Sequence, residues 1–337
     1  MVKKKRMNLY PWLLIHYKNI INHFKQTKKN NSIILETNRG IGTSLLVKMI
    51  GYWLLCSQKE KNFLFCKTCK NCILMNTKNH PDWYDMELLS TKNIIGIEII
   101  KTVCNQIFYT PKKDRNKIVY FPNVSKITKH GINALLKTLE EPPKNTYFLF
   151  TNYLSHSLCS TLRSRCILYK ISVPLEKISY TWLKNKNPKM NKKTIITCLR
   201  INQGLPMLTQ KFISKSLWKE RDTFLLYLQD FIKNGSFFRL LNNFKLGNIE
   251  KKIFWLCSLL LDSIKIEYDN ENNIINLDKI SMIKFLQSQC SFYLLDYSLR
   301  SWMHCNFKLN NIIGINSELL LTEQLLRWKS TLKVNKN

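Results

Sequence analysis

The sequence predicts an α/β fold in which a mostly parallel sheet carries helices on both faces, followed by helical domains. Short apolar runs of strand length alternate with amphipathic helical patterns between residues 33 and 169, and this alternation is typical of parallel sheets. Residues 216–337 show no strand alternation but several long amphipathic patterns. With 337 residues and 45% hydrophobic content, the chain is long enough for two or three domains with their own cores.

The elements of the predicted sheet follow one another closely along the chain. A packing segment, Tyr10–Leu13, precedes the first helix, and two prolines after residue 141 stop the helix expected before them. Strands are expected at 33–35, 83–88, 117–123, 147–151 and 167–169, and helices at 46–55, 97–107, 128–140 and 158–162. In the second half, helices are expected at 178–183, 194–201, 217–231, 253–264, 280–295 and 319–332.

Between the first strand and its helix lies a stretch with the outline of a phosphate-binding loop. Compared with the pattern G-x-x-x-x-G-K-[ST], only Gly42 and Ser44 match. Thr37 stands where the first glycine belongs, and Thr43 replaces the lysine that would reach the phosphates. A hydroxyl offers one neutral hydrogen bond where an ammonium group would neutralise charge. We therefore expect no ATP in this site, and Gly40 and Gly42 to preserve only the shape of the turn.

The strand expected at 117–123 lacks a second feature of an ATP-hydrolysing site. In an ATPase of this architecture the strand ends in an acidic pair that holds Mg²⁺ and polarises the attacking water. Pro122 and Asn123 stand at those positions. The loop and the strand thus predict a nucleotide site without its chemistry.

Four cysteines are spaced as C-x9-C-x2-C-x2-C: Cys56, Cys66, Cys69 and Cys72. Two residues between thiolates let a tight turn direct both sulfurs at one tetrahedral zinc ion, and four protein ligands leave no open position for catalysis. The pattern predicts a structural zinc site. The alternatives are four unrelated thiols or a redox CxxC pair, although no strand leads directly into the motif.

The charge and the hydropathy of the chain limit its partners and its location. A formal net charge of +31 indicates a polyanion partner, with nucleic acid the foremost candidate, although lysine is abundant everywhere in the chain. The basic segment 1–6 lacks the long apolar region and the cleavage site of a signal peptide. No apolar run approaches the length of a membrane span, so we expect a cytoplasmic protein with no membrane partner.

Two motifs in the second quarter of the chain resemble the clamp-loader branch of the AAA+ proteins. These are N-A-L-L-K-T-L-E-E-P-P at 133–143 and T-L-R-S-R-C at 161–166. The four cysteines, the following H-P-D at 80–82, Y-P-W-L at 10–13 and G-I-N-S-E-L-L at 314–320 extend the resemblance over nearly the whole chain. It implies a RecA-like AAA+ domain at 1–172 with a zinc module inserted at 56–72, a small helical lid domain at 173–215 and a helical collar, or oligomerisation, domain at 216–337.

The resemblance also gives Arg165 a role. It implies that the arginine of S-R-C lies at a subunit boundary and reaches the γ-phosphate of ATP bound by a neighbour, whereas the residue alone could equally be a surface or salt-bridged arginine. Thr151 and Asn152 fall where the family senses its own nucleotide. The resemblance also implies that Met207 stands where active relatives carry a second sensor arginine. A third residue for nucleotide chemistry is therefore missing.

The function implied is an ATP-inert subunit of the bacterial replicative clamp loader, within a DNA polymerase holoenzyme, a nucleotidyltransferase. Expected partners are the ATPase subunits of the gamma/tau type, the delta subunit, the sliding clamp and primer-template DNA, the last two reached through the complex. Two other readings remain. A divergent active P-loop ATPase requires the lost residues to be dispensable, and an autonomous basic, zinc-containing nucleic-acid-binding protein predicts strong, salt-dependent DNA binding by the isolated chain.

Overall fold

The computed structural model describes residues 9–26, 31–59, 63–90, 94–109, 116–154, 158–267 and 273–333. The basic segment 1–6, for which the sequence predicts no signal peptide, lies outside the described residues. The chain divides into two compact units, Met1–Pro174 and Leu175–Asn337.

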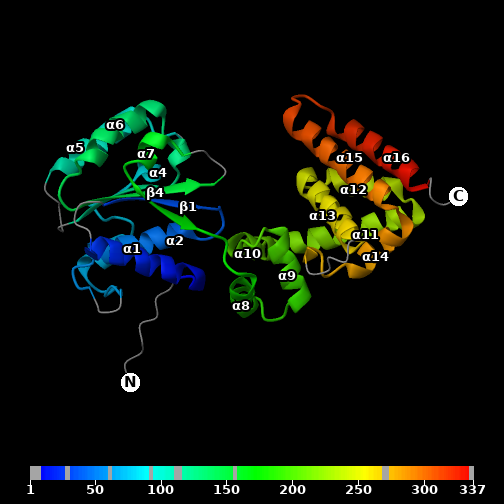
Figure 1. Ribbon diagram of the computed structural model, residues 1–337, viewed down its shortest axis with the longest axis horizontal. Coiled ribbons are helices and arrows are strands. Elements are labelled where there is room, and N and C mark those ends of the chain that lie inside the picture. Colours follow the sequence, from blue (N-terminus) through cyan, green and yellow to red (C-terminus); the bar gives the residue numbers. More distant parts are fainter. Residues whose placement is uncertain are drawn as a thin grey trace, which may run out of the picture. The chain divides into compact units, whose positions relative to one another are not determined.

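The first unit is built on a five-stranded parallel sheet with the strand order β2-β3-β4-β1-β5. Helices cover both faces: α1 and α2 lie on one, and α5, α6 and α7 lie on the other (Figure 1). The predicted fold class, a parallel sheet with two helical layers, is confirmed. The strands are β1 (Ser32–Thr37), β2 (Trp83–Asp85), β3 (Lys117–Phe121), β4 (Thr146–Tyr153) and β5 (Ile167–Ile171). The helices are η1 (Pro11–Leu13), α1 (Leu14–Gln26), α2 (Thr43–Leu55), α3 (Lys70–Asn76), α4 (Met86–Leu89), α5 (Ile97–Phe108), η2 (Val124–Lys126), α6 (Lys129–Glu140) and α7 (Ser160–Arg163).

The central strands are buried because helices cover them on both sides. Every residue of β3 is buried, and Phe121 stacks on Phe150 of β4 with ring centroids 4.7 Å apart. Burial on both faces explains why these strands read as continuous apolar runs. Between β3 and β4, α6 begins at the cap Thr128, whose Oγ1 accepts a 3.1 Å hydrogen bond from the Gly131 amide.

Two predicted strands end earlier than expected because a polar side chain caps a helical turn. The strand expected at 83–88 stops at Asp85, whose Oδ1 accepts a 3.1 Å bond from the Glu87 amide and starts α4. The strand expected at 117–123 stops at Phe121. There Asn123 caps η2 through the amide and the hydroxyl of Ser125.

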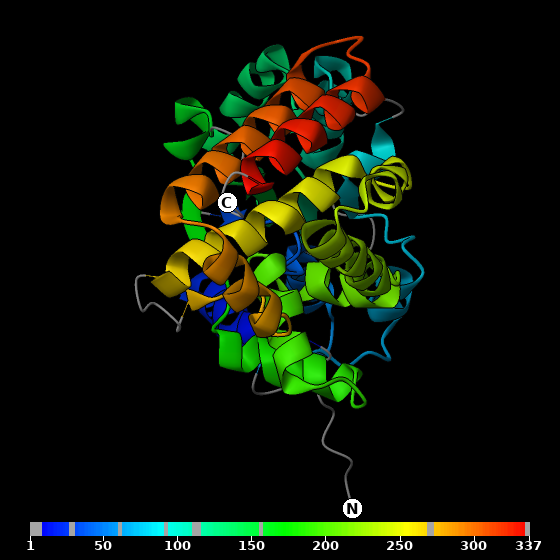
Figure 2. The ribbon, with the colours of Figure 1, turned by 90° about the vertical axis from the view of Figure 1, so that its right-hand side faces the viewer.

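The second unit is helical throughout its described residues. Its helices α13, α15 and α16 pack side by side (Figure 2). The helix predicted at 280–295 is two helices, because Cys290 turns into the core with an extended backbone (φ −130°) and ends the first of them. The elements are α8 (Glu176–Lys186), α9 (Lys192–Ile201), α10 (Pro206–Ser214), α11 (Leu217–Asn234), α12 (Phe237–Lys245), α13 (Ile249–Glu267), α14 (Ile280–Gln289), α15 (Phe292–Asn311) and α16 (Ser317–Lys333).

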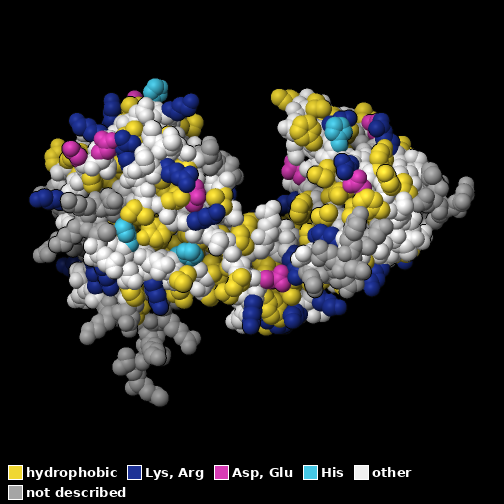
Figure 3. Space-filling model, viewed as in Figure 1, with side chains coloured by type: hydrophobic (Ala, Val, Ile, Leu, Met, Phe, Trp, Pro, Cys, Tyr) yellow, Lys and Arg dark blue, Asp and Glu magenta, His cyan; other side chains and the backbone are white. Residues whose placement is uncertain are grey.

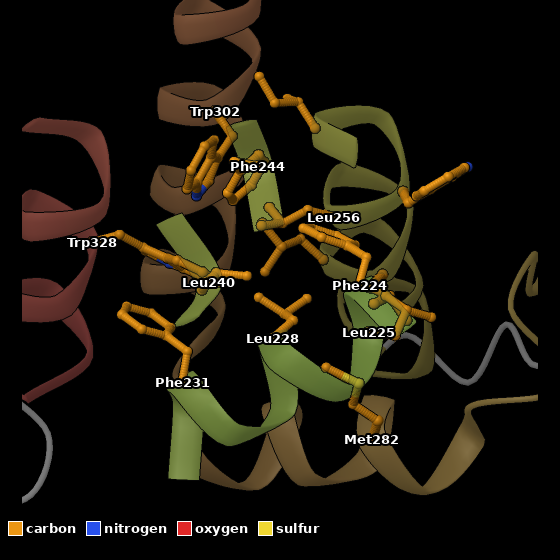
Figure 4. Packing of buried hydrophobic residues seen from close by; sticks show 14 of the residues in the cluster. Phe224, Leu225, Leu228, Phe231, Leu240, Phe244, Leu256, Met282, Trp302 and Trp328 are labelled. Carbon is orange, nitrogen blue, oxygen red and sulfur yellow. The ribbon is translucent and has the colours of Figure 1, made fainter. Parts of the chain in front are cut away.

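One aromatic-rich cluster forms most of the core of the second unit (Figure 4). Phe244 stacks on Trp302 and Phe231 stacks on Trp328, each pair with ring centroids 5.6 Å apart. The cluster runs from Cys198 to Trp328 and so takes residues from both sides of position 215. The boundary between a lid domain and a collar domain at that position stays a prediction. None of the described helices has the length and apolar character needed to cross a membrane.

Candidate functional site

The degenerate loop joins β1 to α2 and depends on two glycines with left-handed backbones. Gly40 has φ +95° and Gly42, the N-cap of α2, has φ +96°. Side chains other than glycine rarely adopt these angles, so the predicted role of both glycines in the shape of the turn has a direct geometric basis. The loop follows the carboxyl end of β1, the edge of a parallel sheet where ligands commonly bind.

Two aromatic side chains from the segment before α1 cover this loop. The rings of Tyr10 and Trp12 stack with centroids 5.0 Å apart, and Trp12 Nε1 donates a 2.9 Å hydrogen bond to the carbonyl of Ile41. A Cβ atom on Gly42 would lie only 2.5 Å from Cε2 of Tyr10. The side of Gly42 on which a Cβ would project is therefore occupied by this chain's own tyrosine, a contact that the sequence did not reveal.

The two threonines of the loop bond to each other. Thr43 Oγ1 donates a 3.1 Å hydrogen bond to Thr37 Oγ1, which in turn donates to the Asn38 carbonyl. Thr37 and Thr43 are both buried, whereas Ser44 is exposed. The Thr43 hydroxyl, which stands in place of the expected lysine, is thus buried and hydrogen-bonded within the loop.

The neighbouring strand ends carry buried polar side chains. Asn123 stands at the position of the expected carboxylate and is buried. Its Oδ1 accepts hydrogen bonds from the amide and the hydroxyl of Ser125 and so caps η2. Thr151 and Asn152 are buried in β4, where they pair in register with Leu35 and Glu36 of β1. In the second unit, Met207 is the second residue of α10 and is half-buried.

The four cysteines predicted as metal ligands come together. All four sulfur atoms lie within 4.8 Å of one another, and three of the separations are 3.6 Å (Cys56–Cys66), 4.0 Å (Cys56–Cys69) and 3.9 Å (Cys66–Cys72). Four sulfurs at about 2.3 Å from a tetrahedral metal ion would be separated by about 3.8 Å. The cluster therefore has the size and the donor set of a four-thiolate metal site.

Backbone amides support the sulfurs in this cluster. The amides of Cys66, Cys69 and Cys72 lie 3.5, 3.3 and 3.5 Å from the sulfurs of Cys56, Cys66 and Cys69. Burial raises the pKa of the Cys69 thiol, but hydrogen bonds from Ser57 and from the Cys72 amide outweigh it and lower that pKa to about 6. Burial raises the pKa of the Cys56 and Cys72 thiols. Some of the thiols are thus already disposed to ionise, as metal ligands must.

Contacts outside the cluster connect it to the helices of the first unit. Cys56 is the C-cap of α2, and Cys69 is the N-cap of α3. The Tyr17 hydroxyl donates a 2.8 Å bond to the Phe63 carbonyl, and Asn71 Nδ2 donates a 3.1 Å bond to the Leu55 carbonyl. The cluster therefore sits in a folded module that is fastened to α1 and α2.

Arg165 lies just after α7 and is held by a carboxylate that the sequence analysis did not single out. Its Nε donates a 2.7 Å hydrogen bond to Glu140 Oε1, and Nη2 binds the same oxygen. Nη1 donates to the Thr161 carbonyl at 3.1 Å. The Arg165 side chain is 30% exposed and that of Glu140 is 50% exposed, so the pair lies at the surface of the first unit. Glu140 and Arg165 belong to the two motifs that carry the family resemblance, and the fold joins them.

Comparisons with known proteins cover both units of the chain. The family model described as "DNA polymerase III, delta subunit" matches residues 15–174, and the model "DNA polymerase III, delta subunit, C terminal" matches residues 215–330. The chain is 41% identical over 326 residues to DNA polymerase III subunit delta' of Buchnera aphidicola subsp. Acyrthosiphon pisum, covering 97% of this chain and 99% of the relative. It is 30% identical to the Yersinia pestis subunit of that name over 333 residues, covering 97% of each.

A shorter match involves another subunit. Over 168 residues the chain is 30% identical to DNA polymerase III subunit gamma of Buchnera aphidicola subsp. Schizaphis graminum, covering 50% of this chain and 45% of the relative. The full-length matches and both family models agree on one assignment. The chain belongs to the family of DNA polymerase III delta' subunits, which are components of the clamp loader.

Proposed function

We propose that this protein is an ATP-inert subunit of the bacterial replicative clamp loader, in the cytoplasm, and that it supplies Arg165 to the ATP site of a neighbouring subunit. Its role is to help load the sliding clamp onto primed DNA without hydrolysing ATP in its own site. The observation that carries the proposal is the contrast between the two places where nucleotide chemistry would occur. The chain's own loop is filled, whereas Arg165 lies at the surface with its guanidinium oriented.

Both the packing of the loop and its residue types support the proposal that the chain does not hydrolyse ATP. The Tyr10 ring lies over Gly42, and the Thr43 hydroxyl is bonded to Thr37 inside the loop. Asn123 cannot hold Mg²⁺ as a carboxylate would, because a neutral amide brings no charge and its oxygen already accepts two hydrogen bonds. A nucleotide would meet a tyrosine ring beside Gly42 and would find a buried hydroxyl, and no lysine, at position 43.

The position of Arg165 supports a role in trans. A guanidinium is planar and always charged, so it stabilises the charge that develops during phosphoryl transfer, an effect worth about 10³ to 10⁵ in rate when supplied by a neighbour. The bonds to Glu140 and to the Thr161 carbonyl restrict the side chain before any partner binds. Less orientational freedom is then lost when it meets a phosphate.

We further propose that the four-cysteine cluster holds a structural zinc ion. The ligands would be Cys56, Cys66, Cys69 and Cys72, whose separations fit a tetrahedral shell. A closed shell of four protein ligands supplies folding free energy and leaves no site for a substrate.

The other partners and domains are proposed from family membership. Partners would be the gamma and delta subunits, with the sliding clamp and primer-template DNA reached through the assembled complex. Residues 1–172 would form the AAA+ domain, 173–215 its lid and 216–337 the collar that joins the subunits.

The finger role is tested by replacing Arg165 in a reconstituted clamp loader. We expect Arg165→Ala to leave assembly unchanged, as measured by gel filtration, and to slow the DNA-stimulated ATP hydrolysis of the complex at least tenfold. Arg165→Lys should be nearly as slow, since an ammonium group lacks the planar fork. The matched control is Arg163→Ala, an exposed arginine two residues away.

Unchanged hydrolysis by the Arg165→Ala complex would rule out the finger role. A fall in hydrolysis that accompanies a loss of assembly would assign Arg165 to the interface alone. Hydrolysis of ATP by the isolated wild-type chain would favour the divergent ATPase instead.

A further inference from the structure

The first part of the chain is depleted in acidic residues far beyond the rest. Residues 1–81 contain 15 lysines and arginines but only two acidic residues, Glu36 and Glu60. A general bias toward lysine codons would spread the excess evenly, whereas residues 82–337 contain 38 basic and 20 acidic residues. In Figure 3 no acidic side chain is visible over α1. Of the described basic residues in this range, five lie on α1 and the four-cysteine module: Lys18, Lys25, Lys59, Lys67 and Lys70.

Lysines of this region rest on aromatic rings, which fixes their positions. Lys25 Nζ lies 4.4 Å from the centre of the Phe63 ring and 5.6 Å from that of Trp53. Lys59 Nζ lies 4.4 Å from the centre of the same Trp53 ring. Two ammonium groups from α1 and from the module thus share one indole. Cation–π contacts of this kind hold the charges in place without neutralising them.

The same surface continues across the module and along α1. The backbone of Lys59 pairs with that of Phe65, and Lys67 Nζ lies 6.0 Å from the centre of the Phe65 ring. On α1, Lys18 precedes Lys25 by seven residues, so the two side chains lie about two turns apart on one side of the helix. With the exposed Lys70 at the start of α3, these lysines form what we call the basic face: Lys18, Lys25, Lys59, Lys67 and Lys70.

Four of the five charges of the basic face are available to an external anion. Within the described part of the chain, Lys18, Lys25, Lys67 and Lys70 make no ion pair with a carboxylate, whereas Arg165, Lys126 and Arg200 each do. All five lysines are exposed. Fixed, like-charged ammonium groups along one surface match a ligand whose negative charges repeat along a line.

We propose that the basic face binds the phosphate backbone of DNA without regard to sequence, as a contact separate from Arg165. Nucleic acid is proposed in preference to an anionic lipid surface because the two rings that carry these lysines, Trp53 and Phe65, are buried and cannot insert into a bilayer, and the most exposed apolar side chains beside the lysines are single isoleucines, Ile15 and Ile73. Ammonium groups contact phosphates as point charges, so they contribute affinity and register but no base specificity. This contact, made by the surface of α1 and of the four-cysteine module, would strengthen the binding of a clamp loader to DNA.

The test is a salt titration of DNA binding by the full-length chain. A fluorescein-labelled 30-base-pair duplex is titrated by anisotropy between 50 and 200 mM NaCl, with wild type and with the variant Lys18→Gln, Lys25→Gln, Lys67→Gln. Glutamine keeps part of the aliphatic stem over the rings but removes the charge. We expect the triple variant to bind at least about tenfold more weakly at 50 mM salt and the slope of log K against log[salt] to become shallower by about 2.7.

The matched control carries the same change in net charge on three exposed lysines of the second unit: Lys189→Gln, Lys192→Gln, Lys193→Gln. It should bind DNA within about twofold of wild type, and circular dichroism and metal content should be unchanged in both variants. An equal loss of affinity in both triple variants would show that net charge alone binds DNA and would overturn the proposal. So would no loss in either variant, or binding of wild type to phosphatidylserine vesicles but not to the duplex. The measurement does not involve ATP hydrolysis, so its outcome is independent of the finger role of Arg165.

Discussion

Tyr10 and Thr43 both contribute to the structure of the degenerate loop, one by packing and the other by hydrogen bonding. The tyrosine fills the space above Gly42, and the threonine turns its hydroxyl into the loop toward Thr37. The sequence showed the loss of the lysine at position 43 but gave no sign of the tyrosine, because the two residues are 33 positions apart and only the fold brings them together. The missing lysine and the tyrosine ring thus affect the same turn.

Restoring lysine at position 43 should not restore nucleotide binding. We expect Thr43→Lys to show no measurable heat with Mg·ATP in calorimetry and no hydrolysis, because position 43 is buried and the Tyr10 ring still lies over the turn. The double variant Tyr10→Ala, Thr43→Lys separates the two causes, since binding that appears only there identifies the ring as the block. Micromolar binding by Thr43→Lys alone would show that the ring does not exclude nucleotide.

Arg165 and Glu140 show what residue-level reading of the sequence can and cannot provide. Arg165 was identified from its motif, but the acceptor of its hydrogen bonds was not, although Glu140 stands in the neighbouring motif. Side-chain partners 25 residues apart depend on how α6 and α7 pack, and that packing is decided by burial in the core rather than by local pattern.

At the scale of elements, the four-cysteine module depends on short helical pieces that cannot stand alone. Helix α3 has seven residues, which is too short to be stable in water without tertiary support. Its N-cap Cys69 and its residue Cys72 both belong to the cluster. Metal ligation and helix formation should therefore be coupled in this module.

Replacing a cluster cysteine should remove the metal and loosen the module. We expect wild-type protein purified without chelator to contain about one zinc per chain, and Cys66→Ser to contain far less and to be cleaved faster by protease within residues 56–72. The control is Cys159→Ser, an exposed cysteine outside the cluster, which should keep its zinc. A wild-type chain with little zinc, or full zinc content in Cys66→Ser, would contradict the assignment.

Element boundaries depended on capping that the hydrophobic pattern does not show. The apolar alternation at 83–88 predicts a strand, but Asp85 captures the Glu87 amide and converts its second half into α4. In the second unit the periodicity at 280–295 predicts one helix, and the buried Cys290 divides it. In both cases a single residue redirects the backbone while the hydrophobic pattern continues.

At the scale of the whole molecule, the second unit contains a charge network around a fully buried arginine. Arg221 has no exposed surface, and its Nη1 donates a 2.9 Å hydrogen bond to Asp278. Its Nη2 binds Asn276, whose Nδ2 in turn donates a 2.8 Å bond to the buried Asp262. The guanidinium also lies 4.8 Å from the centre of the Trp218 ring. The network joins α11 and α13 to the segment before α14.

Breaking this network should destabilise the protein strongly. Arg221→Met removes the cation and leaves Asp278 and Asn276 without it, and we expect a loss of about 3 to 5 kcal/mol in the free energy of unfolding. Urea denaturation followed by tryptophan fluorescence measures the change. Arg239→Met is the control, since Arg239 is 74% exposed and its contact with Asp230 is long at 3.6 Å, and it should leave the transition midpoint unchanged. Equal midpoints for both variants would show that the buried network adds nothing to stability.

The sequence by itself determined the fold class, the four cysteines that the fold brings together and the absence of a lysine and of carboxylates from the loop region, and it singled out Arg165 for a proposed role. These features lie in local spacing and in residue chemistry, which a linear pattern contains. Only the tertiary structure placed Tyr10 over Gly42, Glu140 against Arg165 and Lys25 beside Lys59 on one indole ring. Each of these contacts joins residues far apart in the chain, and they meet because the burial of apolar surface packs their elements together.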